Sequence, residues 1–189
     1  MKTIPTKPRR ILVTCPQRLG DVLLTTALVH TLKQAWPAAH IDMLVFRGTE
    51  GVLAGNPDIH QVIAQAPRVG LGQRLKEITQ LWRRYDLAVA AMPTDRSRLA
   101  AWIGGRFRVG FLTEREAQKA WLLNKHVRFD DLDTHTITMQ AELARTLGIK
   151  PLGQVIPPQL SPVQHLMLSQ RLAALQRPIV VLHPCPKFR

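Results

Sequence analysis

A short polar segment with an arginine, a glycine and an aspartate follows the first apolar run of the sequence. Arg18, Gly20 and Asp21 come soon after residues 10–15, which read Arg-Ile-Leu-Val-Thr-Cys. A carboxylate in the first turn of a helix can act as a general base. It can also simply complement the helix dipole, an interaction worth about 0.3–1 kcal/mol. Arg18 beside it can bind an anionic ligand. The residues alone leave both interpretations of Asp21 open.

The same segment lacks the motifs of the common nucleotide-binding enzymes. Gly20 is its only glycine, so it contains neither G-x-G-x-x-G nor a phosphate-binding loop that ends in lysine. This argues against a Rossmann-like dehydrogenase and against a nucleotide hydrolase. A base that a helix amino terminus keeps ionised suits a reaction in which the leaving group departs early and the nucleophile loses its proton late. Glycosyl transfer is such a reaction, by analogy with glycoside hydrolysis.

A second group of candidates follows the fourth apolar run. Arg96 and Ser97 lie there, and an arginine in this position can bind a phosphate or a carboxylate with two parallel hydrogen bonds. Arg98 could share this role. The alternative is a solvated cation at a helix start. His135 precedes another predicted helix, where a histidine either contacts a ligand or caps the helix.

Two other groups of residues that could have a chemical function are better explained by structural roles. Trp82, Arg83 and Arg84 resemble a nucleic-acid patch, but no recognition motif accompanies them, so we interpret them as a solvated helix face with one core tryptophan. Cys15 and Cys185 are far apart and have no metal-ligand spacing, which predicts two free thiols and no metal site.

Short apolar runs alternate with amphipathic segments along the chain, which predicts an α/β fold. In such folds ligands bind at the carboxyl ends of the strands, where both groups of candidates lie. The first helix carries an apolar stripe that should face the sheet, formed by Leu24, Leu28, Leu32 and Ala35. The expected strands are residues 10–15, 41–46, 61–64, 86–92, 106–111 and 126–129, and the principal helices are 21–35, one that ends at 104–105, and 136–147, closed by Gly148.

The composition changes after residue 150. Four proline and glycine residues punctuate a linker, and Ser161-Pro162 then starts a further helix. Residues 179–183 read as a new buried strand. We therefore expect one domain over residues 1–158, and a linker helix with the first strand of a truncated second domain over residues 159–189.

The net charge is the unusual feature of the composition. Twenty-six Lys and Arg against thirteen Asp and Glu give +13 over 189 residues. Such an excess favours a polyanionic partner, whether nucleic acid, an anionic membrane surface or a phosphorylated substrate. The alternative is a solubility bias, or a fragment that lacks an acidic other half. No apolar stretch approaches the roughly 20 residues that span a bilayer, and no signal peptide is evident. The expected location is the cytoplasm.

An ordered series of motifs over nearly the whole chain resembles the ADP-heptose:lipopolysaccharide heptosyltransferases, glycosyltransferase family 9. The resemblance begins with the apolar run and Gly20-Asp21-Val22. It continues through Asn56-Pro57-Asp58, Tyr85-Asp86, Arg96-Ser97, Arg108-Val109-Gly110-Phe111, His135, Leu147-Gly148 and Leu182-His183-Pro184. Cys185 departs from the family, which usually has glycine after His-Pro.

The resemblance implies a GT-B architecture of two Rossmann-like domains with mostly parallel sheets. The amino-terminal domain holds the acidic lipopolysaccharide core acceptor, and the carboxy-terminal domain holds ADP-heptose. Transfer inverts the anomeric centre without a metal or other cofactor, with Asp21 as base. Arg18, Gly20, Arg96, Ser97 and His135 would then contact the acceptor, and the donor-side loop would contain His183 and Lys187.

We therefore predict a glycosyltransferase of lipopolysaccharide core biosynthesis. It would be peripheral at the anionic inner leaflet of the inner membrane, would bind no nucleic acid, and would be inactive without the rest of its donor domain. The rival hypothesis is a basic nucleic-acid-binding α/β module, which predicts oligonucleotide binding that weakens steeply with salt.

Overall fold

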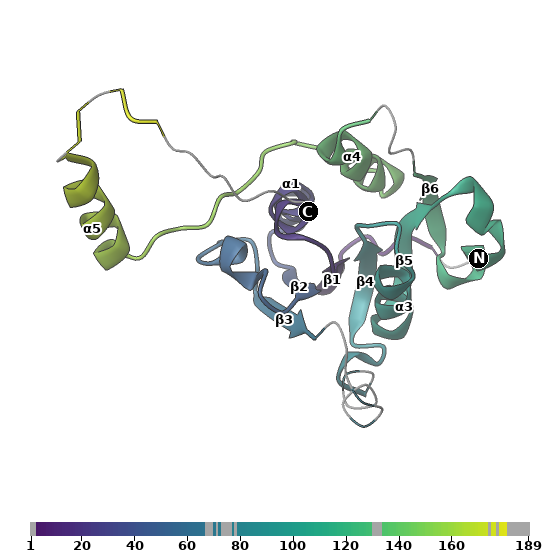
Figure 1. Ribbon diagram of the computed structural model, residues 1–189. Helices are drawn as coiled ribbons and strands as arrows, with labels where there is room; N and C mark the ends of the chain where they lie inside the picture. The colour runs from purple at the N-terminus through teal and green to yellow at the C-terminus, as the bar shows by residue number, and fades with distance from the viewer. Residues whose placement is uncertain are drawn as a thin grey trace. The chain divides into compact units, whose positions relative to one another are not determined.

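The computed structural model describes residues 3–66, 70, 72, 77, 79–129, 134–173, 175–176 and 178–180. The chain divides into two compact units, Met1–Pro158 and Gln159–Arg189. The first unit contains the sheet and its covering helices (Figure 1). The second contains helix α5, Pro162–Ala173, none of whose residues is buried.

A six-stranded parallel sheet organises the first unit, with strand order β3-β2-β1-β4-β5-β6. All five neighbouring strand pairs are parallel. This agrees with the predicted Rossmann-like fold. The strands are β1 (Arg10–Cys15), β2 (His40–Phe46), β3 (Gln61–Gln65), β4 (Tyr85–Ala90), β5 (Gly105–Leu112) and β6 (Lys125–Arg128).

Helices cover both faces of this sheet. On one face α1 packs beside α4, and on the other lies α3, as Figure 1 shows. The α-helices of this unit are α1 (Leu19–Ala35), α3 (Asp95–Gly104) and α4 (Thr136–Thr146), and two 3-10 helices, η1 (Glu50–Leu53) and η2 (Glu114–Leu122), complete the described elements. No described helix is long and apolar enough to cross a membrane.

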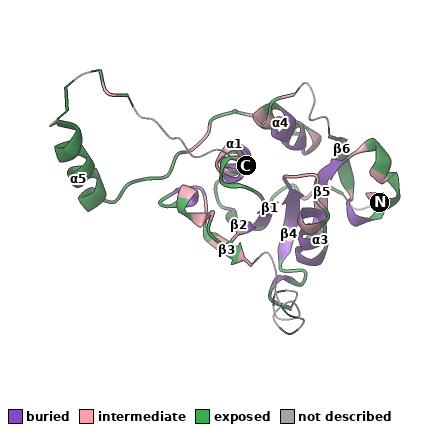
Figure 2. Cartoon of the chain, in the orientation of Figure 1, coloured by how far each residue is buried: buried purple, intermediate pink, exposed green. Residues whose placement is uncertain are grey.

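The central strands are buried on both faces, which is why they read as continuous apolar runs. In β4 the side chains from Leu87 to Ala90 are completely inaccessible to solvent, as predicted for that strand. Figure 2 shows the same burial through the middle of the sheet. Alternate residues of β1 pack on opposite helices: Ile11 and Val13 contact the α1 and α4 side, and Leu12 contacts the α3 side.

Several local predictions need correction. On α1 the buried face is carried by Val22, Thr25, Leu28, Val29 and Leu32, among others, whereas Leu24 is only half-buried and Ala35 is exposed. Leu28 and Leu32 of the predicted stripe are buried, and the buried face is broader than the stripe because α1 packs against α4 as well as the sheet.

Two residues that were predicted to be buried are exposed. Trp82 is 56% exposed and is not a core residue. Val180 is 75% exposed and lies in no strand, and the remainder of the expected strand, residues 181–183, lies outside the described residues. In contrast, Gly148 has a φ of +79°, the left-handed conformation expected of a glycine that follows a helix.

Candidate active site

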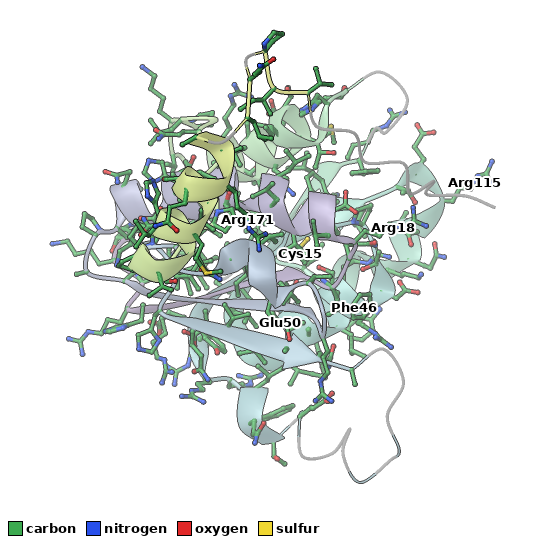
Figure 3. All side chains as sticks on the ribbon, turned by 60° about the vertical axis from the view of Figure 1, so that its left-hand side comes forward. Cys15, Arg18, Phe46, Glu50, Arg115 and Arg171 are labelled. Atoms are coloured by element: carbon green, nitrogen blue, oxygen red, sulfur yellow. The ribbon has the colours of Figure 1, made fainter. Side chains whose placement is uncertain are left out.

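The strand order creates one natural ligand site. Chain connections from β1 and β4, which are adjacent in the sheet, lead to helices on opposite faces, α1 and α3. In open α/β sheets such a switch point leaves a crevice at the carboxyl ends of the strands. The loops of residues 16–18 and 91–94 enter it, and the first turns of α1 and α3 lie beside it. Cys15, Arg18 and Phe46, labelled in Figure 3, mark this edge of the sheet.

Asp21 lies in the first turn of α1, directly after the end of β1. The chain leaves the strand through a tight turn in which Gln17 N donates to Cys15 O at 2.8 Å. Arg18 is the N-cap residue, and no side chain caps the helix. Val22 N donates to Arg18 O at 3.1 Å, the first bond of the helical ladder. The carboxylate therefore lies at the positive end of the helix dipole, with backbone N–H groups of the first turn beside it.

Buried hydrogen bonds hold this turn against the sheet and α4. Thr25 Oγ1 donates to Asp21 O at 2.7 Å and lies 3.3 Å from Cys15 Sγ. From α4, Gln140 Nε2 donates to Thr25 Oγ1 at 2.8 Å. Thr25 and Gln140 are both almost completely buried. Three elements thus position the backbone of Asp21 through a single threonine hydroxyl.

Cys15 has a structural role beneath this turn. Burial raises the pKa of its thiol to about 12, the hydrogen bond from Thr25 lowers it, and the charge of Asp21 raises it. The thiol is therefore neutral at physiological pH and unsuited to nucleophilic catalysis. This agrees with the predicted free thiol.

Gly20 lies inside α1, not in the loop before it. Its backbone is helical, and a Cβ added there would meet no atom within 4 Å. The conformational freedom of a glycine is therefore not needed at this position. The absence of a side chain instead leaves open space directly beside Asp21.

Ser97 is a structural residue, which contradicts its prediction as an acceptor contact. Its side chain is completely buried. Its hydroxyl donates to Thr14 O at 2.9 Å and lies 2.7 Å from Thr14 Oγ1, and its N–H donates to the capping hydroxyl of Thr94 at 3.2 Å. These bonds dock α3 onto β1 and leave the hydroxyl no proton for a ligand.

Arg96 reaches across the carboxyl edge from α3 towards β2. Its guanidinium carbon lies 5.1 Å from the centroid of the Phe46 ring, a cation–π contact. Phe46 ends β2, so this contact places the Arg96 charge over the strand end next to β1. Arg96 also lines a largely apolar cavity of about 430 Å³ beside α3. Among the predicted acceptor contacts after β4, Arg96 is the one whose position suits a ligand.

Arg98 is buried and paired, so it cannot share this role. Its guanidinium donates to both oxygens of Glu116 at 2.5 and 3.0 Å, to Asp95 at 2.7 Å and to the Phe111 carbonyl at 3.2 Å. Burial raises the pKa of Glu116, but hydrogen bonds from Arg98, Thr113 and Lys119 outweigh it and lower that pKa to about 2. This ionic network fastens η2 to α3.

His135 caps α4. Its Nδ1 accepts a hydrogen bond from Ile137 N at 3.3 Å, and the residue is exposed. The capping alternative is therefore present in the structure, and contact with an acceptor through the other ring nitrogen stays a prediction. His183, Cys185 and Lys187 lie outside the described residues. Over the described part of the chain, no group of three or more His, Cys, Asp or Glu side chains is arranged to hold a metal ion.

The sequence interpretation missed Thr14, Thr25, Phe46 and Gln140. All four position the site without chemistry of their own. A threonine or glutamine on a helix carries no signal that distinguishes a buried tether from a solvated surface residue. Phe46 was read only as the end of an apolar strand.

Comparison with known proteins finds similarity to glycosyltransferases in both sequence and fold. The chain matches no protein-family model. Over 76 residues it is 36% identical to lipopolysaccharide heptosyltransferase 3 of Escherichia coli K12, a match that covers 37% of this chain and 22% of that protein.

Two solved structures share its fold. The glycosyl transferase family 9 protein from Veillonella parvula aligns with a TM-score of 0.72 at 21% identity, over 92% of this chain and 51% of that one. The E. coli heptosyltransferase WaaC, solved with ADP-2-deoxy-2-fluoro heptose, aligns with a TM-score of 0.62 at 20% identity, over 89% and 55%. The chain thus spans about half the length of these neighbours.

Proposed function

We propose that this chain is a heptosyltransferase of glycosyltransferase family 9, which it resembles in sequence and fold, and that its first unit is the acceptor-binding half of a transferase of lipopolysaccharide core biosynthesis. The donor is ADP-heptose and the acceptor is a hydroxyl of the phosphorylated inner core. The sugar is transferred with inversion, and Asp21 is the base. The reaction needs no cofactor in this proposal.

One observation carries the assignment of Asp21. Its carboxylate lies at the β1–β4 switch point, in a helical turn whose backbone is fixed by Thr25, beside a glycine with open space around it. A carboxylate that only complements the helix dipole needs neither the buried hydrogen bond from Thr25 nor the open space at Gly20. A base that must meet a substrate hydroxyl needs both, because proton transfer requires contact at hydrogen-bond distance.

The bond changes follow from this position. The acceptor oxygen forms a bond to the anomeric carbon of heptose while the bond from that carbon to the ADP phosphate oxygen breaks. ADP leaves with the bonding electron pair, and the acceptor proton passes to Asp21. Inversion requires the acceptor oxygen to approach the anomeric carbon from the face opposite ADP.

Arg18 and Arg96 have the charge to hold an acidic acceptor in this orientation. They come from the first turns of α1 and α3, on the two sides of the switch point. A phosphate or sugar-acid carboxylate between them would bind both guanidinium groups, and the acceptor hydroxyl would then lie over Gly20 and Asp21. A net charge of +13 suits the same substrate and the anionic inner leaflet in which it is anchored. The proposed location is therefore the cytoplasmic face of the inner membrane.

The test measures transfer of heptose from ADP-heptose to core-truncated lipopolysaccharide. It uses the natural protein and not the isolated first unit. Asp21→Asn should lower kcat by a factor of about 10²–10⁴, because it keeps the shape of the side chain but cannot take a proton. KM for the acceptor should change little. Asp58→Asn serves as the control, since the Asp58 carboxylate lies ahead of β3, away from the carboxyl ends of the strands, where it pairs with His30 at 2.8 Å. Turnover of Asp21→Asn close to that of the wild type would refute the assignment of the base.

A further inference from the structure

Three tryptophans form an exposed ridge on the α3 side of the first unit. Trp82 precedes β4, Trp102 lies on α3 and Trp121 lies in η2. The Trp82 and Trp102 ring centroids are 6.3 Å apart, and those of Trp102 and Trp121 are 5.8 Å apart, both in edge-to-face geometry. Trp82 is 56% exposed and Trp121 is 65% exposed. We call this set the tryptophan ridge.

The ridge is continuous with further apolar surface. Leu99, on the same helix as Trp102, is 49% exposed. Leu99 and Trp121 both line the apolar cavity of about 430 Å³ next to Arg96. Large apolar side chains contributed to one face by three separate elements are uncommon on soluble proteins and mark an interaction surface.

Arginines flank the ridge at the Trp82 end. The Arg83 guanidinium carbon lies 6.0 Å from the Trp82 ring centroid. Burial and the neighbouring charge of Arg83 both lower the pKa of Arg108. Within the described residues, neither of these arginines nor Arg84 forms an ion pair with a carboxylate. The acidic groups near the other end, Asp95 and Glu116, are already paired with Arg98 and Lys119.

The backbone at Arg83 is held in a costly conformation that fixes this arrangement. Its φ is +47°, in the left-handed region that non-glycine residues avoid at a cost of about 1–2 kcal/mol. The N–H of Arg83 donates to Ile103 O at the end of α3 at 2.9 Å. The conformation places Trp82 and Arg83 against α3, next to Trp102.

We propose that the tryptophan ridge, with Leu99, Arg83 and Arg108, is the surface by which the protein docks onto an anionic phospholipid bilayer. Indole side chains favour the boundary between headgroups and acyl chains, since the ring is apolar and its N–H is polar. The unpaired arginines match the negative headgroup charge.

The geometry favours a membrane over a nucleic acid as the partner. Nucleic-acid bases stack on free aromatic faces. In the ridge, Trp102 lies nearly perpendicular to both neighbours, at 80° and 79°, so the three rings do not form the parallel platform on which successive bases stack. Leu99 and the largely apolar wall of the cavity suit acyl chains better than bases. Of the two cations that also line it, Lys119 is paired with Asp95 and Glu116, and Arg96 belongs to the proposed acceptor site.

This inference deepens the proposed function, because it rests on the acceptor being held in a membrane. The test uses vesicles of phosphatidylethanolamine with and without phosphatidylglycerol, and no lipopolysaccharide, so docking is measured apart from transfer. Binding is measured by co-sedimentation. Quenching of tryptophan fluorescence by brominated acyl chains is measured in a Trp36→Phe background, since Trp36 is the one tryptophan of the chain that lies outside the ridge.

We expect binding to vesicles with phosphatidylglycerol, and quenching that shows the ridge within the acyl boundary. Trp82→Ala and Trp121→Ala should each weaken binding about tenfold, because more than half of each side chain is available to the bilayer. Arg83→Gln should weaken it about fivefold. The matched controls are Leu152→Ala, at a residue 52% exposed outside the ridge, and Arg128→Gln, whose side chain is 72% exposed.

Equal loss of binding in the ridge and control variants would overturn the inference, as would vesicle binding without quenching. Binding to single-stranded oligonucleotides through Trp82 and Trp121, with none to vesicles, would overturn it in favour of a nucleic-acid surface. Heptose transfer that persists in detergent in ridge variants that no longer bind vesicles supports both proposals. If Asp21→Asn loses heptose transfer but vesicle binding does not depend on the ridge residues, the docking surface is refuted and the assignment of the base stands.

Discussion

Replacing Glu116 with glutamine removes the carboxylate that neutralises the buried guanidinium of Arg98. The Arg98 side chain is completely inaccessible, whereas that of Glu116 is 19% exposed. Both Glu116 oxygens accept from Arg98, and Lys119 and the Thr113 cap add further bonds. A glutamine can keep one of these acceptors but leaves the positive charge of Arg98 without its main partner.

The magnitude follows from the pKa of Glu116, which folding lowers from 4.5 to about 2. Each unit corresponds to about 1.4 kcal/mol, so the ionised carboxylate contributes about 3 kcal/mol to the free energy of unfolding at neutral pH. Loss of one partner of a buried ion pair costs a similar amount, about 3–5 kcal/mol. Because the pKa is lowered, this stability is present above pH 4.5 and disappears as the pH falls towards 2.

The assay is guanidinium denaturation of wild type and Glu116→Gln at several pH values between neutral and 2. The two free energies of unfolding should differ by about 3 kcal/mol at neutral pH and converge near pH 2. Glu114→Gln is the matched control, since Glu114 lies two residues away and pairs with Arg128 at the surface, with both side chains at least 70% exposed. Its cost should stay below about 0.5 kcal/mol. Equal costs for the two variants, or a difference that does not change with pH, would refute the reasoning.

Three further predictions concern the candidate site. Gly20→Ala should raise the free energy of unfolding by up to about 1 kcal/mol, because alanine favours the helix and its Cβ meets nothing, yet lower heptose transfer about tenfold by filling the space beside Asp21; unchanged transfer would contradict the assigned acceptor position. Ser97→Ala should cost about 1–3 kcal/mol of stability by leaving Thr14 without its partner, with no change in acceptor KM measured at a temperature where the variant is folded. In a Cys185→Ser background, Cys15 should react with iodoacetamide at pH 8 only after unfolding, because its pKa is about 12; rapid labelling of the folded protein would show that the thiol is accessible.

The strands and the position of Asp21 could be predicted from the sequence because both depend on local signals. The continuous apolar run of β4 has no alternation, which predicts a strand buried on both faces, and the structure has it so. Asp21 could be placed at the ligand edge because a polar segment between a strand and a helix must lie there in a parallel sheet. Ser161-Pro162 likewise predicted the start of α5, which begins at Pro162.

Surface and tertiary features had no comparable signal. Trp82 was assigned to the core because tryptophan is usually buried, but it belongs to a ridge whose other members lie 20 and 39 residues further along the chain. Thr25 donates directly to Asp21 O, but its hydroxyl is also held by Gln140, which is 115 residues away. Such pairings depend on how helices meet, and a single sequence does not reveal them.

The residues 96–98 show how finely a helix divides neighbouring side chains among different roles. Successive residues of an α-helix point about 100° apart. At the start of α3 this rotation directs Arg96 to the strand ends and the cavity, Ser97 into β1, and Arg98 towards Glu116 of η2. In the sequence, one arginine stands on each side of Ser97, and all three side chains are equally suited to an anionic ligand. The structure places Arg96 at the strand ends, whereas Arg98 is committed to Glu116. A charge-removing substitution at Arg96 therefore tests ligand binding, whereas the same substitution at Arg98 tests folding.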